Sequence, residues 1–198
     1  MKLGILGGTF NPPHIGHLVC AQEAHDQLGL DRVVLMPAGQ PPHKQVEADP
    51  GAEARYALCR AAIAGDERFD VSRLELERPG QSFTVDTLKA LHDQSPQDDL
   101  TFIVGGDMAR SLPTWREPEA VLELATLAVA ERAADEREAI AAAVAPLSGS
   151  EHVRFLDMPR VDVSSSLVRE RVATGRPIRY LVPDAVAGAI AKNGWYRA

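Results

Sequence analysis

A glycine- and histidine-containing stretch near the amino terminus is the most informative part of the sequence: Gly7-Gly8-Thr9-Phe10-Asn11-Pro12-Pro13-His14-Ile15-Gly16-His17. A short apolar run, Leu3–Leu6, precedes it, and a helical pattern follows from about His17 to Leu28. The order predicts a buried strand, a loop and a helix. Paired glycines let backbone N–H groups come close to a ligand, and the start of a helix attracts phosphate through its unpaired N–H groups and its dipole.

The two histidines of this stretch favour a phosphate site. His14 and His17 are three residues apart, so they share one face of the first helical turn. Two imidazoles there can donate to phosphate oxygens and stabilise the charge that develops in phosphoryl or nucleotidyl transfer. The alternatives are a capping or packing role and a zinc site, but no third and fourth zinc ligand stands nearby in the sequence. The loop is neither the dinucleotide fingerprint nor the Walker loop.

Strand-length apolar runs alternate with helical patterns along the rest of the chain. Strands are predicted at Leu3–Leu6, Arg32–Met36, Phe69–Leu76, Leu100–Val104, Thr126–Ala130 and His152–Leu156. Helices are predicted at His17–Leu28, Ala52–Ala64, Thr84–His92, Ala133–Val144, Ser165–Ala173 and Pro183–Lys192. This order predicts an α/β fold, a doubly wound, Rossmann-like parallel sheet with helices on both faces. We expect a single domain over residues 1–198, with a small C-terminal helical part from about residue 164.

Composition limits the classes of function. The chain has a net charge of −7, which argues against nucleic-acid binding, and no apolar stretch approaches a membrane span. The start enters its glycine loop without a cleavage site, so we interpret it as a strand and not as a signal peptide. Cys20 and Cys59 are predicted to be buried free thiols in a reducing cytoplasm. Whether the protein is a monomer or a homo-oligomer is left open.

The stretch Gly7–His17 resembles the signature of the HxGH nucleotidyltransferase superfamily, and within it that of the bacterial nicotinate-mononucleotide adenylyltransferases. The similarity extends from Lys2 to Tyr196, and the family often has aspartate where this chain has Asn11. The resemblance implies that ATP is bound by Gly7, Gly8, Thr9, Phe10, His14 and His17.

A second signature lies at Ser164-Ser165-Ser166-Leu167-Val168-Arg169. Serines before a helical pattern are typical of an N-cap, and hydroxyls, N–H groups and an arginine at a helix start also form an anion site. The run resembles the family's serine-rich segment that holds ATP phosphates. It implies that Ser165, Ser166 and Arg169 bind ATP, and that His14, His17 and Arg169 are catalytic.

The acceptor site is implied by shorter segments. The resemblance assigns nicotinate mononucleotide binding to His43, Lys44, Thr84, Asp107, Trp115 and Arg132. Trp115 either stacks a pyridine ring or covers the core, whereas Trp195 is assigned to packing. The family commonly has Pro-Gly after the arginine that matches Arg132, and this chain has Ala133-Ala134. Residues 38–50, rich in proline and glycine, form the candidate mobile lid.

The resemblance implies transfer of AMP from ATP to nicotinate mononucleotide. The products are nicotinate adenine dinucleotide and pyrophosphate, in NAD biosynthesis. Mg²⁺ would bridge phosphate oxygens and keep most of its waters, so no metal ligands are assigned to the protein. The alternatives are nicotinamide mononucleotide or another phosphate acceptor, and a nucleotide sensor that has no turnover.

Overall fold

The computed structural model describes residues 1–41, 48–131 and 133–197. Within them, six parallel strands form one sheet in the order β3-β2-β1-β4-β5-β6. The strands are β1 (Lys2–Gly8), β2 (Arg32–Pro37), β3 (Phe69–Val71), β4 (Asp99–Gly105), β5 (Thr126–Ala130) and β6 (Val153–Leu156). The chain builds outward from β1 to β3 and then returns to the other side of β1, which is the predicted doubly wound arrangement.

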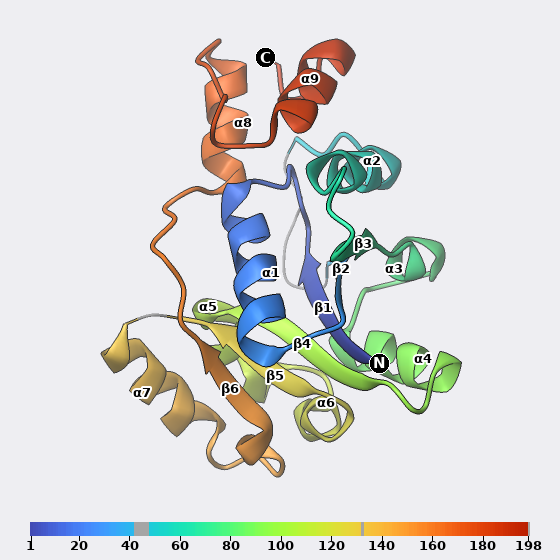
Figure 1. The fold of residues 1–198 in the computed structure, drawn as a ribbon, viewed down its shortest axis with the longest axis vertical. Coiled ribbons are helices and arrows are strands. Elements are labelled where there is room, and N and C mark those ends of the chain that lie inside the picture. Colours follow the sequence, from blue (N-terminus) through green and yellow to red (C-terminus); the bar gives the residue numbers. More distant parts are fainter. Residues whose placement is uncertain (42–47, 132, 198) are drawn as a thin grey trace.

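Helices cover both faces of the sheet. They are α1 (Ile15–Leu28), α2 (Ala52–Ala62), α3 (Leu74–Glu77), α4 (Thr84–Gln94), α5 (Gly106–Arg110), α6 (Pro118–Leu124), α7 (Ala134–Val144), α8 (Ser165–Ala173) and α9 (Asp184–Asn193), with short 3₁₀ turns at Leu112–Thr114 and Ser150–His152. Figure 1 shows α1 in front of the sheet, and α8 and α9 together at one end, beyond the carboxyl end of β1.

Side chains along the central strands point alternately to the two faces of the sheet, so the core is divided into two clusters. Ile5 packs on one face with Leu88 of α4, whereas its neighbour Leu6 packs on the other face with Ala21 of α1. Successive side chains of a strand point to opposite faces, so β1 contributes to both clusters. The doubly covered sheet explains why the central strands are apolar almost throughout.

The C-terminal helices form a third apolar cluster. Val168 of α8 and Ile190 of α9 are buried there together with Leu58 of α2. Trp195 packs against this cluster, which confirms its assignment to packing. The last helices are therefore attached to the sheet domain through α2.

The structure differs from the sequence predictions in two places. The strand predicted at Phe69–Leu76 is wrong beyond Val71, because the N–H of Leu74 donates to Ser72 Oγ at 3.1 Å and the chain turns into α3. The alternating pattern arises instead from a helical turn that buries Glu75. The short helices α5 and α6 were not predicted, since neither is long enough to show a clear period.

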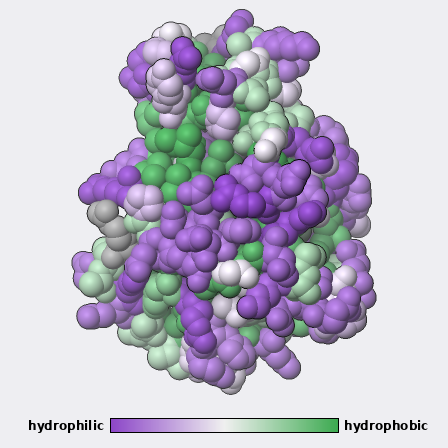
Figure 2. All heavy atoms as spheres, in the orientation of Figure 1, coloured by the Kyte–Doolittle hydropathy of each residue, from purple (hydrophilic) through white to green (hydrophobic). Residues whose placement is uncertain are grey.

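The surface is largely hydrophilic on the face shown in Figure 2. Apolar side chains gather where the start of α1 meets the lower end of α8, and Ile15, Leu18 and Val19 in this part of α1 are partly exposed. Cys20 and Cys59 are buried free thiols, as predicted. In the described ranges, no helix is both long and apolar enough to span a membrane.

Candidate active site

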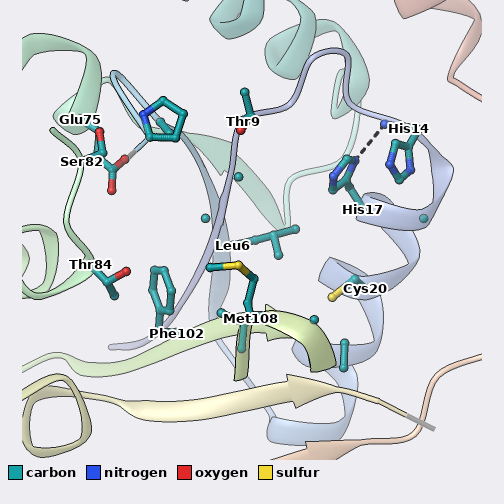
Figure 3. Close-up of a pocket in the computed structure, with 18 of the residues that line it drawn as sticks. Leu6, Thr9, His14, His17, Cys20, Glu75, Ser82, Thr84, Phe102 and Met108 are labelled. Atoms are coloured by element: carbon teal, nitrogen blue, oxygen red, sulfur yellow. Dashed lines mark hydrogen bonds between the residues drawn. The ribbon is translucent and has the colours of Figure 1, made fainter. Parts of the chain in front are cut away.

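A cavity of about 570 Å³ opens at the carboxyl ends of the central strands. Its floor is made by Gly7 and Gly8 of β1, Ala38 after β2, Val104 and Gly105 of β4, and Ala130 of β5. This is the point between β1 and β4 where the strand order reverses, which is where doubly wound sheets bind ligands. Figure 3 shows His14 and His17 on one side, and Glu75, Ser82 and Thr84 across from them.

The two histidines lie together at one end of the cavity. Their ring centroids are 3.7 Å apart, and the His14 backbone N–H donates to His17 Nδ1 at 3.1 Å (Figure 3). Phe10 packs its ring edge-on against His17 with a centroid distance of 4.9 Å. His14 is buried and its Nδ1 has no hydrogen-bond partner among the described residues. A buried polar atom of this kind, at a cavity wall, fits contact with a ligand.

The histidines are uncharged at neutral pH in the ligand-free protein. Burial lowers the pKa of His14 to about 4. Burial also lowers the pKa of His17, and the neighbouring His14 lowers it further. An anion placed beside them would favour the protonated forms and raise both pKa values. The pair can therefore meet a polyphosphate as neutral donors and gain positive charge as it binds.

Glycines of the loop make room for aromatic rings. A Cβ at Gly16 would lie 3.1 Å from both Cε1 and Nδ1 of His14, so a side chain there would push the imidazole from its place. A Cβ at Gly8 would lie 3.1 Å from the Phe10 ring, which is buried with a φ of +50°. The sequence predicts that these glycines let a ligand approach the backbone closely. The structure shows that they are also needed to pack the neighbouring aromatic rings.

The serine-rich segment is brought against the first loop. Ser165 Oγ donates to the Pro12 carbonyl at 2.8 Å, and Arg169 Nη1 donates to the Asn11 carbonyl at 2.8 Å. Ser164 is the N-cap of α8 and accepts from the Leu167 N–H, which confirms the capping interpretation. The structure therefore places both signatures side by side, although Arg169 faces a second, neighbouring hollow that Tyr196 also lines.

Ser166 also lines that second hollow, and its hydroxyl accepts from Arg169 Nη2 at 3.2 Å. Ser165, Ser166 and Arg169 are therefore not among the residues that line the first cavity. Their role with ATP stays a prediction.

Two predicted acceptor residues line the far end of the cavity. Thr84 begins α4, and Trp115 follows the 3₁₀ turn at Leu112–Thr114. The Trp115 indole is 9% exposed, its Nε1 donates to Ser111 Oγ at 3.0 Å, and its ring meets Phe102 edge-to-face at 6.2 Å. Trp115 is therefore both a core residue and a wall of the cavity, so the two readings of the sequence are compatible.

Among the other predicted acceptor residues, only Asp107 is described, and it does not line the cavity. Asp107 is exposed in the first turn of α5 and is not among the lining residues. His43, Lys44 and Arg132 lie outside the described residues. Glu131 Oε1 accepts from the Ala133 N–H at 2.9 Å, so part of that acidic side chain is directed at its own loop.

Arg55 of α2 was missed in the sequence, although it joins two loops of the site. Its guanidinium is 1% exposed; Nη1 donates to the carbonyls of Thr9 at 3.0 Å and Ala38 at 2.7 Å, and Nε pairs with Asp49 at 3.1 Å. Thr9 belongs to the histidine loop and Ala38 to the segment after β2. The available signal was an arginine on the apolar face of a helix, next to Leu58.

Glu75 and Arg116 also line the cavity and were missed. Glu75 accepts from Thr87 Oγ1 at 2.7 Å, and burial raises the pKa of its carboxyl. The Arg116 guanidinium lies over the Phe83 ring, 5.0 Å from its centroid. Neither residue shows a periodic signal in the sequence, because Glu75 stands in a four-residue helix and Arg116 in a bend before α6.

Known proteins resemble this chain over its full length. Residues 5–171 match the family described as Cytidylyltransferase-like. A Thermus thermophilus protein named probable nicotinate-nucleotide adenylyltransferase is 46% identical over 197 residues, with 100% of both chains covered. A Roseiflexus protein of the same name is 45% identical, covering 98% of each chain. Plasmodium falciparum nicotinic acid mononucleotide adenylyltransferase complexed with NaAD shares the fold, with a TM-score of 0.76 at 16% identity over 98% of this chain and 97% of that chain.

Proposed function

Since this chain belongs to the nicotinate-nucleotide adenylyltransferase family, we propose that it transfers AMP from ATP to nicotinate mononucleotide and releases pyrophosphate. The dinucleotide product, nicotinate adenine dinucleotide, places the reaction in NAD biosynthesis. The observation that carries the proposal is the cavity itself, with the histidine pair at one end and Thr84 and Trp115 at the other.

The two ends suit the two halves of the reaction. The phosphates of ATP would lie at the start of α1, where His14 offers a buried nitrogen without a partner. The pyridine would lie against Trp115, near the start of α4. The reacting phosphate and α-phosphorus would then meet over Gly7 and Gly8, where the backbone can come close.

The chemistry is a direct displacement. An oxygen of the mononucleotide phosphate attacks the α-phosphorus of ATP, the bond from that phosphorus to the bridging oxygen breaks, and pyrophosphate leaves. The nucleophile is already anionic at neutral pH, so a general base adds little. Catalysis consists of holding the two groups in line and stabilising charge on the phosphates, which we assign to His14, His17 and Arg169.

Mg²⁺ is proposed to arrive with ATP. In the part of the chain that the structure describes, no group of three or more His, Cys, Asp or Glu side chains is placed to hold a metal. A Mg²⁺ ion bound to ATP would be held by phosphate oxygens and water, and it would neutralise phosphate charge. We also propose a cytoplasmic enzyme with no nucleic-acid or membrane partner.

Product analysis tests the proposal. The protein is incubated with ATP, Mg²⁺ and one acceptor at a time (nicotinate mononucleotide, nicotinamide mononucleotide or phosphopantetheine), and the products are identified by mass spectrometry. We expect nicotinate adenine dinucleotide as the fastest-formed product. Faster adenylylation of phosphopantetheine would contradict the pyridine assignment, and binding of ATP with no product from any acceptor would favour the sensor.

A further inference from the structure

The charges along the cavity wall are few. Among the described lining residues, Arg116 is the only arginine or lysine, and Glu75 is the only aspartate or glutamate. Arg116 directly follows Trp115, the proposed stacking residue. The remaining wall at this end is formed largely by Phe83, Thr84 and Phe102. A single cation in such a wall influences which ligand charge is accepted.

Contacts with α4 hold the Arg116 side chain at this wall. Its guanidinium lies 5.0 Å from the Phe83 ring centroid, and its Nη1 is 3.3 Å from Asp86 Oδ2. Phe83 directly precedes Thr84, and Asp86 stands in the first turn of the same helix. Arg116 therefore joins the segment that carries Trp115 to the segment that carries Thr84. Thr84, Trp115 and Arg116 line the same cavity, so a ring stacked at Trp115 would lie near the guanidinium.

We propose that Arg116 is a specificity-determining residue that favours a pyridine acceptor with a ring carboxylate over one with a carboxamide. This inference rests on the proposed function. A planar guanidinium pairs with a carboxylate through two parallel, charge-assisted hydrogen bonds. A carboxamide offers one acceptor and turns its own N–H donors toward the guanidinium donors. The start of α4 adds further positive potential on the same side.

Opposing charges limit the size of the effect. Asp86 and Glu117 both lie close to the guanidinium, and Arg116 is 51% exposed, so water screens its field. Glu75 opposes a carboxylate less than its formal charge suggests, because burial raises the pKa of its carboxyl. We therefore expect a preference of roughly 10-fold from Arg116, which corresponds to about 1.4 kcal/mol.

The test compares two acceptors in matched variants. Arg116→Gln removes the charge, Arg116→Lys keeps it, and Arg32→Gln is the control. Arg32 is 48% exposed, forms a similarly weak ion pair with Asp70 at 3.7 Å, and begins β2 at the opposite end of the sheet. For each variant, kcat/KM is measured with nicotinate and nicotinamide mononucleotide at low and high salt, together with the melting temperature.

The expected result is a selective loss. Arg116→Gln should lower the ratio of the two kcat/KM values about 10-fold, mainly through a higher KM for the nicotinate acceptor, and the wild-type ratio should fall with salt. Arg116→Lys keeps the charge but cannot form the two parallel hydrogen bonds, so it should keep only part of the ratio. Arg32→Gln should leave the ratio unchanged.

An unchanged ratio of the two kcat/KM values in Arg116→Gln would overturn the inference. If both values fell equally, Arg116 would only support Trp115; if neither fell, Arg116 would have no role in acceptor binding. If the wild type turned over neither acceptor, the proposed function would be wrong instead. Calorimetric binding of the two mononucleotides to wild type and Arg116→Gln would then decide the selectivity separately.

Discussion

The phenol of Tyr196 donates to the side-chain carbonyl of Asn11 at 2.8 Å, and both residues are buried. The bond joins the end of the chain to its first loop across 185 positions. Arg169 binds the Asn11 backbone carbonyl in the same region. The C-terminal helices therefore hold the loop that carries His14, so the last residues of the chain belong to the structure of the site.

Removal of this hydrogen bond should weaken both stability and turnover. Tyr196→Phe is expected to lower the free energy of unfolding by about 1 kcal/mol, because the phenol contact is buried. It should also reduce kcat several-fold by loosening the loop. Urea denaturation and pyrophosphate release measure the two effects. Tyr180→Phe is the control, since Tyr180 is 76% exposed; equal behaviour of the two variants would show that Tyr196 has no special role.

A methyl group at Gly16 should disturb catalysis more than folding. The added Cβ would lie 3.1 Å from the His14 ring, which must shift by some tenths of an ångström or more. We expect a fall in kcat on the order of 10- to 100-fold, the scale of a small misplacement in an active site. The matched variant is Gly188→Ala in α9, where a Cβ meets nothing within 4 Å. It should keep full activity and gain about 0.5–1 kcal/mol of stability, as alanine does in a helix. Full activity in Gly16→Ala would contradict the proposed role of His14.

The low pKa of His14 makes stability depend on pH. An unfolded histidine binds a proton near pH 6.5, whereas His14 in the folded protein does so at about 4. Between these values the unfolded state holds a proton that the folded state lacks, so stability falls as pH drops from about 6.5 to 4. The contribution amounts to roughly 3 kcal/mol over that window. The free energy of unfolding, measured by urea denaturation at pH 7, 6, 5 and 4, should fall less steeply with pH in His14→Gln than in wild type. The same pH dependence in both proteins would rule out a neutral, buried His14.

Arg55 should act through the loops that it joins. In Arg55→Lys, one ammonium cannot reach Thr9, Ala38 and Asp49 together, so we expect a loss of roughly 1–3 kcal/mol and a larger fall in kcat/KM than stability explains. Leu58→Ala is the control, because Leu58 is fully buried on the same helix and contacts the C-terminal cluster. It should destabilise the protein by about 2–5 kcal/mol and leave kcat/KM of the folded fraction near wild type. Equal kcat/KM values in the two variants would show that Arg55 stabilises the fold but does not position the loops of the site.

The sequence predicts the sheet well because the central strands are buried on both faces. Runs such as Leu100–Val104 can hardly form anything else between two helical patterns, and the glycine–histidine stretch specifies the loop after β1. Short-range patterns mislead at Phe69–Leu76. The chain turns after β3, where Ser72 Oγ accepts from the Leu74 N–H, and the buried Glu75 has its partner Thr87 on another helix.

The site is predicted only where its residues stand in local motifs. His14 and His17 are predicted because they stand where the loop after β1 begins a helix, whereas Thr84 and Trp115 are predicted from segments that resemble the family. Arg55 and Tyr196 act through backbone or side-chain groups far away in the chain, and no local pattern contains those partners. Such contacts become visible only when the fold brings the segments together.

The most direct test of the central claim is pyrophosphate release from ATP and Mg²⁺, with nicotinate and nicotinamide mononucleotide compared in wild type and His17→Ala. The account predicts rapid release with nicotinate mononucleotide, slower release with nicotinamide mononucleotide, and a loss of about 100-fold or more in His17→Ala, the scale of losing one charge-stabilising donor. Release with neither acceptor, or full activity in His17→Ala, would contradict it.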